Sequence, residues 1–223
     1  MKKNQATDIK LHFYTDKTFW KFFILAVLSG FCIFLSFPNT STFYTAFFAL
    51  VPLIYMTESE LSGKRLFFFG YIMQITTMLG GFYWLIHTIQ LHGHLPLAAA
   101  IPIFILYISF FGLRFPLFML ISRYLRRNTG FSPFLIYPVV FTAIEFFFPD
   151  LFPWFLANSQ HNNLYFIQIA DITGVYGISF VLAFINVALY VIILNRKNVP
   201  TLQKNIYLYI TASIIIVFYV YGF

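Results

Sequence analysis

Long apolar segments alternate with short polar connections along most of the chain. Seven apolar segments can be read, at residues 19–37, 41–57, 66–89, 96–122, 131–148, 175–194 and 205–223. A helix needs about 20 apolar residues, and at least roughly 17, to cross the hydrocarbon core of a bilayer. Only helices and closed barrels satisfy the backbone in lipid, and these segments lack the alternation of barrel strands. The pattern predicts an all-α, polytopic membrane protein with a seven-helix transmembrane bundle.

The composition supports a membrane protein with one membrane domain. Hydrophobic residues make up 60% of the sequence, charged residues 9%, and the mean hydropathy is +0.80. Soluble domains carry about 25% charged residues, so a soluble globular protein is excluded. We expect residues 1–18 to form a cytoplasmic N-terminal segment and residues 19–223 to form one membrane domain. The first apolar segment is expected to be an uncleaved anchor, because no signal-peptide cleavage pattern follows it.

The basic residues fall on one side of the predicted bundle. With seven spans, every Lys and Arg except Arg114 lies in the N-terminal segment, at the adjoining start of the first span (Lys21), or close to the connections after the second, fourth and sixth spans. Cytoplasmic loops are enriched in Lys and Arg. We therefore predict a cytoplasmic N-terminus and an outward-facing C-terminus. The net charge of +7 is explained by this topology and by some affinity for anionic lipid, so nucleic-acid binding is not expected.

Besides Lys21 at the start of the first segment, two charged residues lie inside predicted spans. Glu145 falls near the outer end of segment 131–148. A carboxylate at this depth indicates a functional site unless it reaches the headgroup layer, and both readings remain open. Arg114 lies about eight residues from the cytoplasmic end of its segment, roughly 12 Å at 1.5 Å per residue. We expect its side chain to extend toward that end and not to pair with Glu145.

A polar run, Asn158 to Asn163, lies in the connection predicted to face outward before segment 175–194. Trp84 and Trp154 mark the same boundary, either as an interfacial aromatic belt or beside an acyl chain. From these features we predict substrate-binding candidates at the mouth of a lipid-facing cleft: Glu145, Trp154, Asn158, Gln160 and His161, with Trp84 beside them. We predict no catalytic residue and no metal ligand. The outward pair His92 and His94 lacks zinc-site spacing, so a metal transporter is the weaker alternative.

Nucleophilic catalysis has little support in the outward-facing connections. They contain no Cys and no Lys, and the single cysteine, Cys32, lies in the first apolar segment, where core packing explains it. Ser159 and His161 are close in sequence, but no nucleophile-elbow motif surrounds them.

Nearly the whole chain resembles the membrane half of bacterial apolipoprotein N-acyltransferase. The fairly specific part is Gly174-Val175-Tyr176-Gly177-Ile178-Ser179-Phe180 with Asn186 in the following helix. Further matching elements are Leu35-Ser36-Phe37-Pro38, Gly70, Gly81-x-x-Trp84, Glu145-Phe146, Phe152-Pro153-Trp154, Ser159-Gln160 and Gln168-x-Ala170-Asp171. The resemblance implies a multi-pass protein of the bacterial cytoplasmic (inner) membrane with roles in lipoprotein biosynthesis. It implies phospholipid and a lipoprotein as substrates, and no cofactor.

Members of the family continue into an outward-facing nitrilase-like domain, whose Glu-Lys-Cys triad carries an acyl chain as a thioester. The present sequence stops at Phe223, and Phe148 stands where the family has an Arg after its Glu. We therefore expect a membrane domain that binds phospholipid and lipoprotein at the outer leaflet, is inactive alone and needs a separately encoded nitrilase-like subunit. The alternative is a non-enzymatic lipid-binding or scaffold protein.

Overall fold

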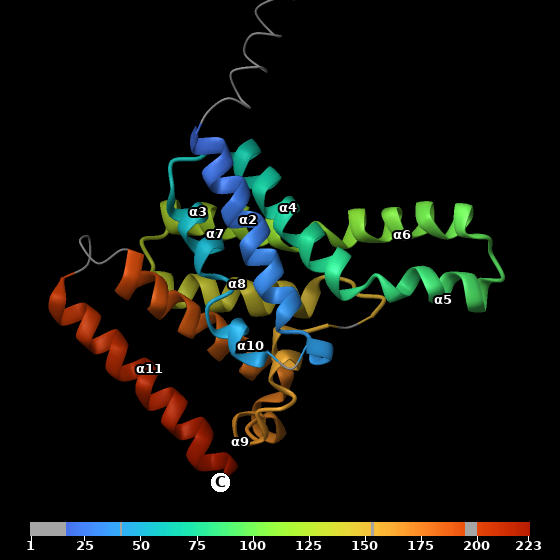
Figure 1. The fold of residues 1–223 in the computed structure, drawn as a ribbon. Coiled ribbons are helices and arrows are strands. Elements are labelled where there is room, and N and C mark those ends of the chain that lie inside the picture. The colour runs from blue at the N-terminus through green and yellow to red at the C-terminus, as the bar shows by residue number, and fades with distance from the viewer. Residues whose placement is uncertain (1–16, 41, 153, 195–199) are drawn as a thin grey trace, which may run out of the picture.

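The computed structural model describes residues 17–40, 42–152, 154–194 and 200–223, and every regular element in these ranges is a helix (Figure 1). The predicted all-α fold is confirmed. The predicted cytoplasmic segment, residues 1–18, lies outside the described ranges except for its last two residues. Arg196 and Lys197, two of the predicted topology signals, also lie outside them.

The helices follow the predicted apolar segments but are divided more finely. In chain order the elements are α2 (Lys17–Leu35), η1 (Pro38–Thr40), η2 (Phe43–Phe47), α3 (Val51–Glu58), α4 (Gly63–Gly81), α5 (Trp84–Gly93), α6 (Leu97–Phe111), α7 (Arg114–Asn128), α8 (Pro133–Phe147), η3 (Leu156–Gln160), α9 (Leu164–Ile167), α10 (Ala170–Leu189), η4 (Tyr190–Leu194) and α11 (Thr201–Gly222).

Several of these helices can cross a bilayer. Within the described residues, four stretches are long and apolar enough, namely Lys17–Leu35, Leu97–Asn128, Ala170–Leu194 and Thr201–Gly222. A fifth is obtained if α4 and α5, which meet at a bend of 60°, count as one broken span. Phe43–Glu58 and Pro133–Phe147 are apolar but shorter. The chain is therefore a multi-pass membrane protein, and the seven-span count stays a prediction.

The long apolar segment 96–122 is interrupted in its middle, which the sequence analysis did not predict. Helix α6 ends at Phe111 and α7 begins at Arg114. Pro116 explains the interruption, because proline has no N–H to donate to the carbonyl four residues earlier, that of Gly112. The break places Arg114 in the first turn of a new helix.

A second interruption lies in α10. Gly174 has φ 64° and ψ −175°, a combination that is almost restricted to glycine. Continuous helix therefore runs from Val175, which agrees with the predicted start of the segment 175–194, although helical turns already begin at Ala170.

Two glycines allow the helices of the bundle to approach closely. A Cβ on Gly30 of α2 would clash with the carbonyl oxygen of Met73 in α4. A Cβ on Gly70 of α4 would lie 3.0 Å from the backbone of Pro116 in α7. Small residues at such crossings are the usual means of close helix packing in membranes. Helix α4 is thereby held between α2 and α7.

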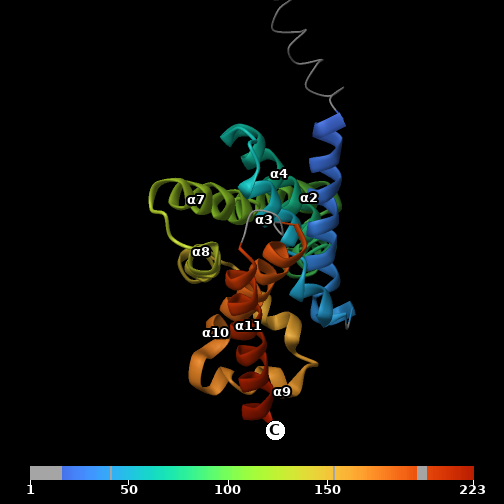
Figure 2. The ribbon, with the colours of Figure 1, turned by 90° about the vertical axis from the view of Figure 1, so that its left-hand side faces the viewer.

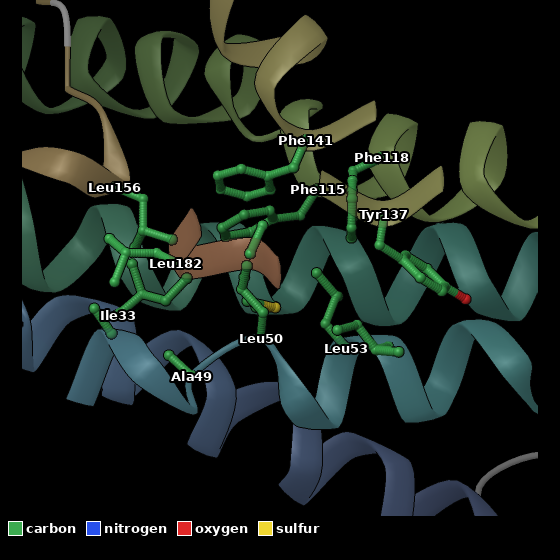
Figure 3. Close-up of a cluster of buried hydrophobic side chains, with 14 of the residues drawn as sticks. Ile33, Ala49, Leu50, Leu53, Phe115, Phe118, Tyr137, Phe141, Leu156 and Leu182 are labelled. Atoms are coloured by element: carbon green, nitrogen blue, oxygen red, sulfur yellow. The ribbon is translucent and has the colours of Figure 1, made fainter. Parts of the chain in front are cut away.

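The core lies where α2, α3, α7, α8 and α10 meet (Figure 3). Leu156, from the segment after α8, points toward Leu182 of α10 and Ile33 of α2, and all three are buried. Helix α11 lies at the edge of this core, to which it contributes Phe218, and packs along α9 and α10, as Figures 1 and 2 show. Most of its side chains are exposed, as expected for a helix that faces lipid.

Asn186 joins α10 to the start of α3. Its Nδ2 donates to the carbonyl oxygens of Ala46 and Leu182, and its Oδ1 accepts from the N–H of Leu50, each at 2.8 Å. The chain between η2 and α3 is not helical at this point, so its backbone groups need partners from elsewhere. Asn186 supplies them from a neighbouring helix.

A cluster of charged residues closes the end of the bundle where α3 ends. The Arg123 guanidinium of α7 donates to four carbonyl oxygens, those of Met56, Thr57, Ser59 and Leu61. One helical turn further on, Arg126 pairs with Glu58 at 2.8 Å, and the hydroxyl of Tyr137 donates to the same carboxylate at 2.7 Å. These arginines hold the end of α3 against α7 and α8.

Candidate functional site

Glu145 is buried at the opposite end of the bundle, near the end of α8. The residue is only 4% exposed, and its Oε1 accepts a hydrogen bond from the N–H of Leu156 at 2.7 Å. Leu156 is the first residue of η3, and the first N–H groups of a helix have no partner within it. Glu145 thus anchors the start of η3, which leads into the predicted polar run. The next N–H, that of Ala157, donates to Ser179 Oγ at 3.1 Å.

Arg114 joins the same site, which corrects the prediction made from its sequence position. Its Nη1 lies 3.1 Å from Oδ2 of Asp150 and 3.2 Å from the carbonyl oxygen of Trp154. The side chain thus reaches the segment after α8 and does not extend toward the Arg123 end. Burial raises the pKa of the Asp150 carboxyl above its ordinary value, and the nearby guanidinium of Arg114 only partly offsets this effect.

Trp154 lies between a polar cavity and an apolar groove. Its ring stacks on Phe37, with centroids 4.4 Å apart and planes 12° from parallel. On one side it lines an internal cavity of about 10 Å³. The cavity walls are Gln74 of α4, Arg114, Phe115 and Phe118 of α7, Phe141, Ile144 and Glu145 of α8, and Trp154.

On its other side Trp154 faces a groove that we name the α5 groove. It consists of two adjoining hollows of about 210 and 420 Å³ that share Phe152. The first is lined by Phe37, Pro38, Gly81, Phe82, Trp84, Phe152 and Trp154, and the second by Leu85, Thr88, Ile89, His92, Gly93, Ile103, Tyr107, Leu151 and Phe152. The groove therefore follows the α5–α6 hairpin, which projects to the right in Figure 1.

Trp84 stands at the bend where this groove begins. Its Nε1 donates to the carbonyl oxygen of Gly81 at 3.0 Å, which fixes the indole across the bend between α4 and α5. Its ring contacts Phe152 edge-on, with centroids 5.4 Å apart. The structure thus brings Trp84 and Trp154 together in the wall of one groove.

The three remaining predicted residues lie in or next to η3. Gln160 is fully buried: its Nε2 donates to the carbonyl oxygen of Phe43 at 3.1 Å, and its Oε1 accepts from Asn163 at 3.2 Å. Asn163 also donates to the hydroxyl of Tyr219 in α11 at 2.9 Å. Asn158 and His161 are half-buried. These residues connect to Glu145 only through the backbone of η3, and the role of all six candidates in lipid binding stays a prediction.

Gln74, Arg114 and Asp150 belong to the site but were not among the predicted residues. Gln74 carried a usable signal, because it is a polar side chain in the middle of segment 66–89. Its partners come from helices far away in sequence, and no local pattern connects them. Within the described residues, no three His, Cys, Asp or Glu side chains lie close enough to hold a metal ion.

Comparison with known proteins identifies the relatives of this chain. Residues 29–188 match the family model described as the apolipoprotein N-acyltransferase N-terminal domain. Apolipoprotein N-acyltransferase of Geobacter metallireducens is 30% identical over 210 residues, covering 90% of this chain and 39% of that protein. Apolipoprotein N-acyltransferase 2 of Leptospira interrogans is 30% identical over 176 residues, 78% of this chain and 30% of the relative.

A more distant match is apolipoprotein N-acyltransferase of Thermotoga maritima, 26% identical over 201 residues, which cover 86% of this chain and 40% of that protein. The chain thus spans between about three tenths and two fifths of the length of these relatives. The matched family region runs from α2 to α10 and includes both the polar cavity and the α5 groove.

Proposed function

The chain belongs to the apolipoprotein N-acyltransferase family, and from this membership we propose that it is a membrane domain that holds phospholipid and lipoprotein acyl chains for lipoprotein N-acylation. The observation that carries the proposal is the α5 groove. Its two hollows are lined almost wholly by apolar and aromatic side chains, and the first includes Trp154, two residues before the start of η3. An acyl chain needs such an apolar channel, and its headgroup needs polar groups at the mouth.

The proposal includes a topology. We place the seven predicted spans with the Arg123 end of the bundle in the cytoplasm and the η3 end at the outer leaflet of the bacterial inner membrane. Support comes from the charges: the described basic residues lie at or near the Arg123 end, except for Arg114, which is paired with Asp150. Cytoplasmic ends of spans are the ones enriched in Lys and Arg.

The reaction itself needs groups that residues 1–223 do not supply. Acyl transfer through a thioester requires a thiolate and a base. The single cysteine, Cys32, is half-buried within α2, among apolar residues of that helix. We propose that a nitrilase-like catalytic domain encoded outside residues 1–223 provides the nucleophile, while this chain presents the lipid. No cofactor or metal takes part in this role.

A lipid-binding protein without a part in acylation is the second candidate. Both candidates require that the α5 groove accept an acyl chain. They differ in whether filling the groove lowers lipoprotein acylation by the catalytic domain.

A phospholipid with a photoactivatable acyl chain tests the shared step. We expect cross-links from the reconstituted chain to concentrate on the α5 groove, and Ile103→Trp to reduce them, because Ile103 lines the groove and an indole would fill it. Ile105→Trp is the matched control: this residue is on the same helix and similarly exposed, but does not line the groove. Equal labelling of both variants and the wild type would refute the proposal.

Lipoprotein N-acylation with an added nitrilase-like domain then separates the two candidates. Ile103→Trp should lower the acylation rate if the chain presents substrate, with Ile105→Trp close to wild type. Reduced cross-linking with unchanged acylation would favour the lipid-binding candidate. Acyl transfer by the purified chain alone would contradict the proposed division of roles.

A further inference from the structure

Three buried polar atoms without a hydrogen-bond partner in the described chain belong to residues of a single cavity. They are Oε1 of Gln74, Oε2 of Glu145 and Nε1 of Trp154. Gln74 and Glu145 are each only 4% exposed. A buried polar group without a partner costs about 1–3 kcal/mol, so three such groups around one cavity call for a common partner.

We propose that this cavity is the binding site of one water molecule held by Gln74, Glu145 and Trp154. The hydrogen-bonding capacities match. Water donates two hydrogen bonds, which the carbonyl oxygen of Gln74 and the free carboxylate oxygen of Glu145 accept. Water also accepts, and the indole N–H of Trp154 donates. Buried waters typically make about three hydrogen bonds to otherwise unsatisfied groups.

The size and charge of the cavity select water over other small ligands. Its volume of about 10 Å³ is close to that needed by one water molecule. A metal or ammonium ion offers no acceptor to the Trp154 N–H and would lie beside the Arg114 guanidinium in the same wall. An anion would lie beside the Glu145 carboxylate. A neutral molecule with both donors and acceptors satisfies all three groups.

This water joins three parts of the chain that make no direct contact through these atoms. Gln74 comes from α4, Glu145 from α8 and Trp154 from the segment before η3. Since Trp154 also forms a wall of the α5 groove, the water fixes the orientation of a groove residue from the polar side. Gln74 is therefore a positioning residue for Trp154. The inference does not depend on the proposed role in lipoprotein acylation.

The indole N–H of Trp154 is a direct reporter of the bound water. The sequence has three tryptophans, so selective ¹⁵N-indole labelling of the full chain in lipid nanodiscs gives few signals, assigned with Trp154→Phe and Trp84→Phe. We expect a cross-peak between Trp154 Nε1–H and water whose NOE and ROE have opposite signs, as for a water that stays bound in a slowly tumbling complex. Proton exchange with solvent would instead give the same sign in both experiments. Its absence in the wild type would overturn the proposal.

Variants of buried polar residues localise the water. Gln74→Met should abolish the cross-peak or strongly reduce it, whereas Ser122→Ala should leave it unchanged. Ser122 is the matched control because its Oγ is also buried without a partner in the described chain but lies outside this cavity. An unchanged cross-peak in Gln74→Met would overturn the role of Gln74. A signal that appears only when ammonium chloride is added would indicate a cation site instead and also overturn the proposal.

Discussion

The Nη1 atom of Arg114 lies 3.1 Å from Oδ2 of Asp150, so the first residue of α7 is joined to the segment that follows α8. Both side chains are about nine-tenths buried. The same guanidinium nitrogen reaches the carbonyl oxygen of Trp154. One cation therefore fixes the segment that leads from α8 to the polar run at two points.

Removing this cation should destabilise the protein strongly. Arg114→Met leaves the Asp150 carboxylate buried without its partner, and breaking a buried pair in this way costs about 3–5 kcal/mol. We expect a corresponding loss in the free energy of unfolding, measured by denaturing-detergent titration in mixed micelles. Arg127→Met is the control, because its pair with Glu60 is largely exposed and should contribute at most about 1 kcal/mol. Equal losses in the two variants would show that the Arg114 pair is not special.

Asn186 should be intolerant of an apolar replacement of similar size. Asn186→Leu leaves the N–H of Leu50 and the carbonyl oxygen of Ala46 without partners, at about 1–3 kcal/mol for each buried group. The thermal-unfolding midpoint should fall clearly. Asn128→Leu, at the exposed end of α7, should shift it little. A midpoint for Asn186→Leu that matches the wild type would contradict the role assigned to this side chain.

Gly174 should resist even the smallest side chain. A Cβ at this position meets no atom within 4 Å, so crowding is not the obstacle. The obstacle is the backbone conformation, which is almost restricted to glycine. Gly174→Ala should therefore lower the free energy of unfolding by about 1–3 kcal/mol. Gly63→Ala at the start of α4 offers a comparison with ordinary packing around the new methyl group and should be near neutral. A neutral Gly174→Ala would mean that the kink relaxes at no cost.

The proposed topology predicts which positions react from outside the cell. In a Cys32→Ser background, a cysteine at Leu164, which is exposed at the start of α9, should react with a membrane-impermeant maleimide in spheroplasts. A cysteine at Thr129, at the end of α7, should react only after permeabilisation. The reverse pattern would invert the orientation.

The helical fold was predictable because apolar segments of sufficient length have few alternatives in lipid. The interruptions of the helices were harder to predict. Pro116 was visible in the sequence, but whether it kinks or divides a segment depends on the neighbours that hold the two parts. The prediction for Arg114 failed because its partners, Asp150 and the carbonyl group of Trp154, lie about 40 residues later in the sequence and no local pattern connects them to it.

The site was predictable in part. Glu145 and Trp154 were singled out as polar and aromatic residues near a predicted boundary, and the structure places both around one cavity. Gln74 was missed because its significance comes from atoms on α8 and the 149–156 segment, about seventy to eighty residues later in the sequence. Gln160 was expected at an open mouth, yet its amide is occupied by backbone and side-chain partners.

The arginines at the cytoplasmic end of α7, in the proposed topology, have a consequence for how the protein meets anionic membranes. Arg123 is surrounded by four backbone carbonyls, and Arg126 is neutralised by Glu58. These side chains satisfy the charge rule that orients the bundle without reaching toward lipid phosphates. These two arginines should therefore add little to the attraction of phosphatidylglycerol or cardiolipin to the protein.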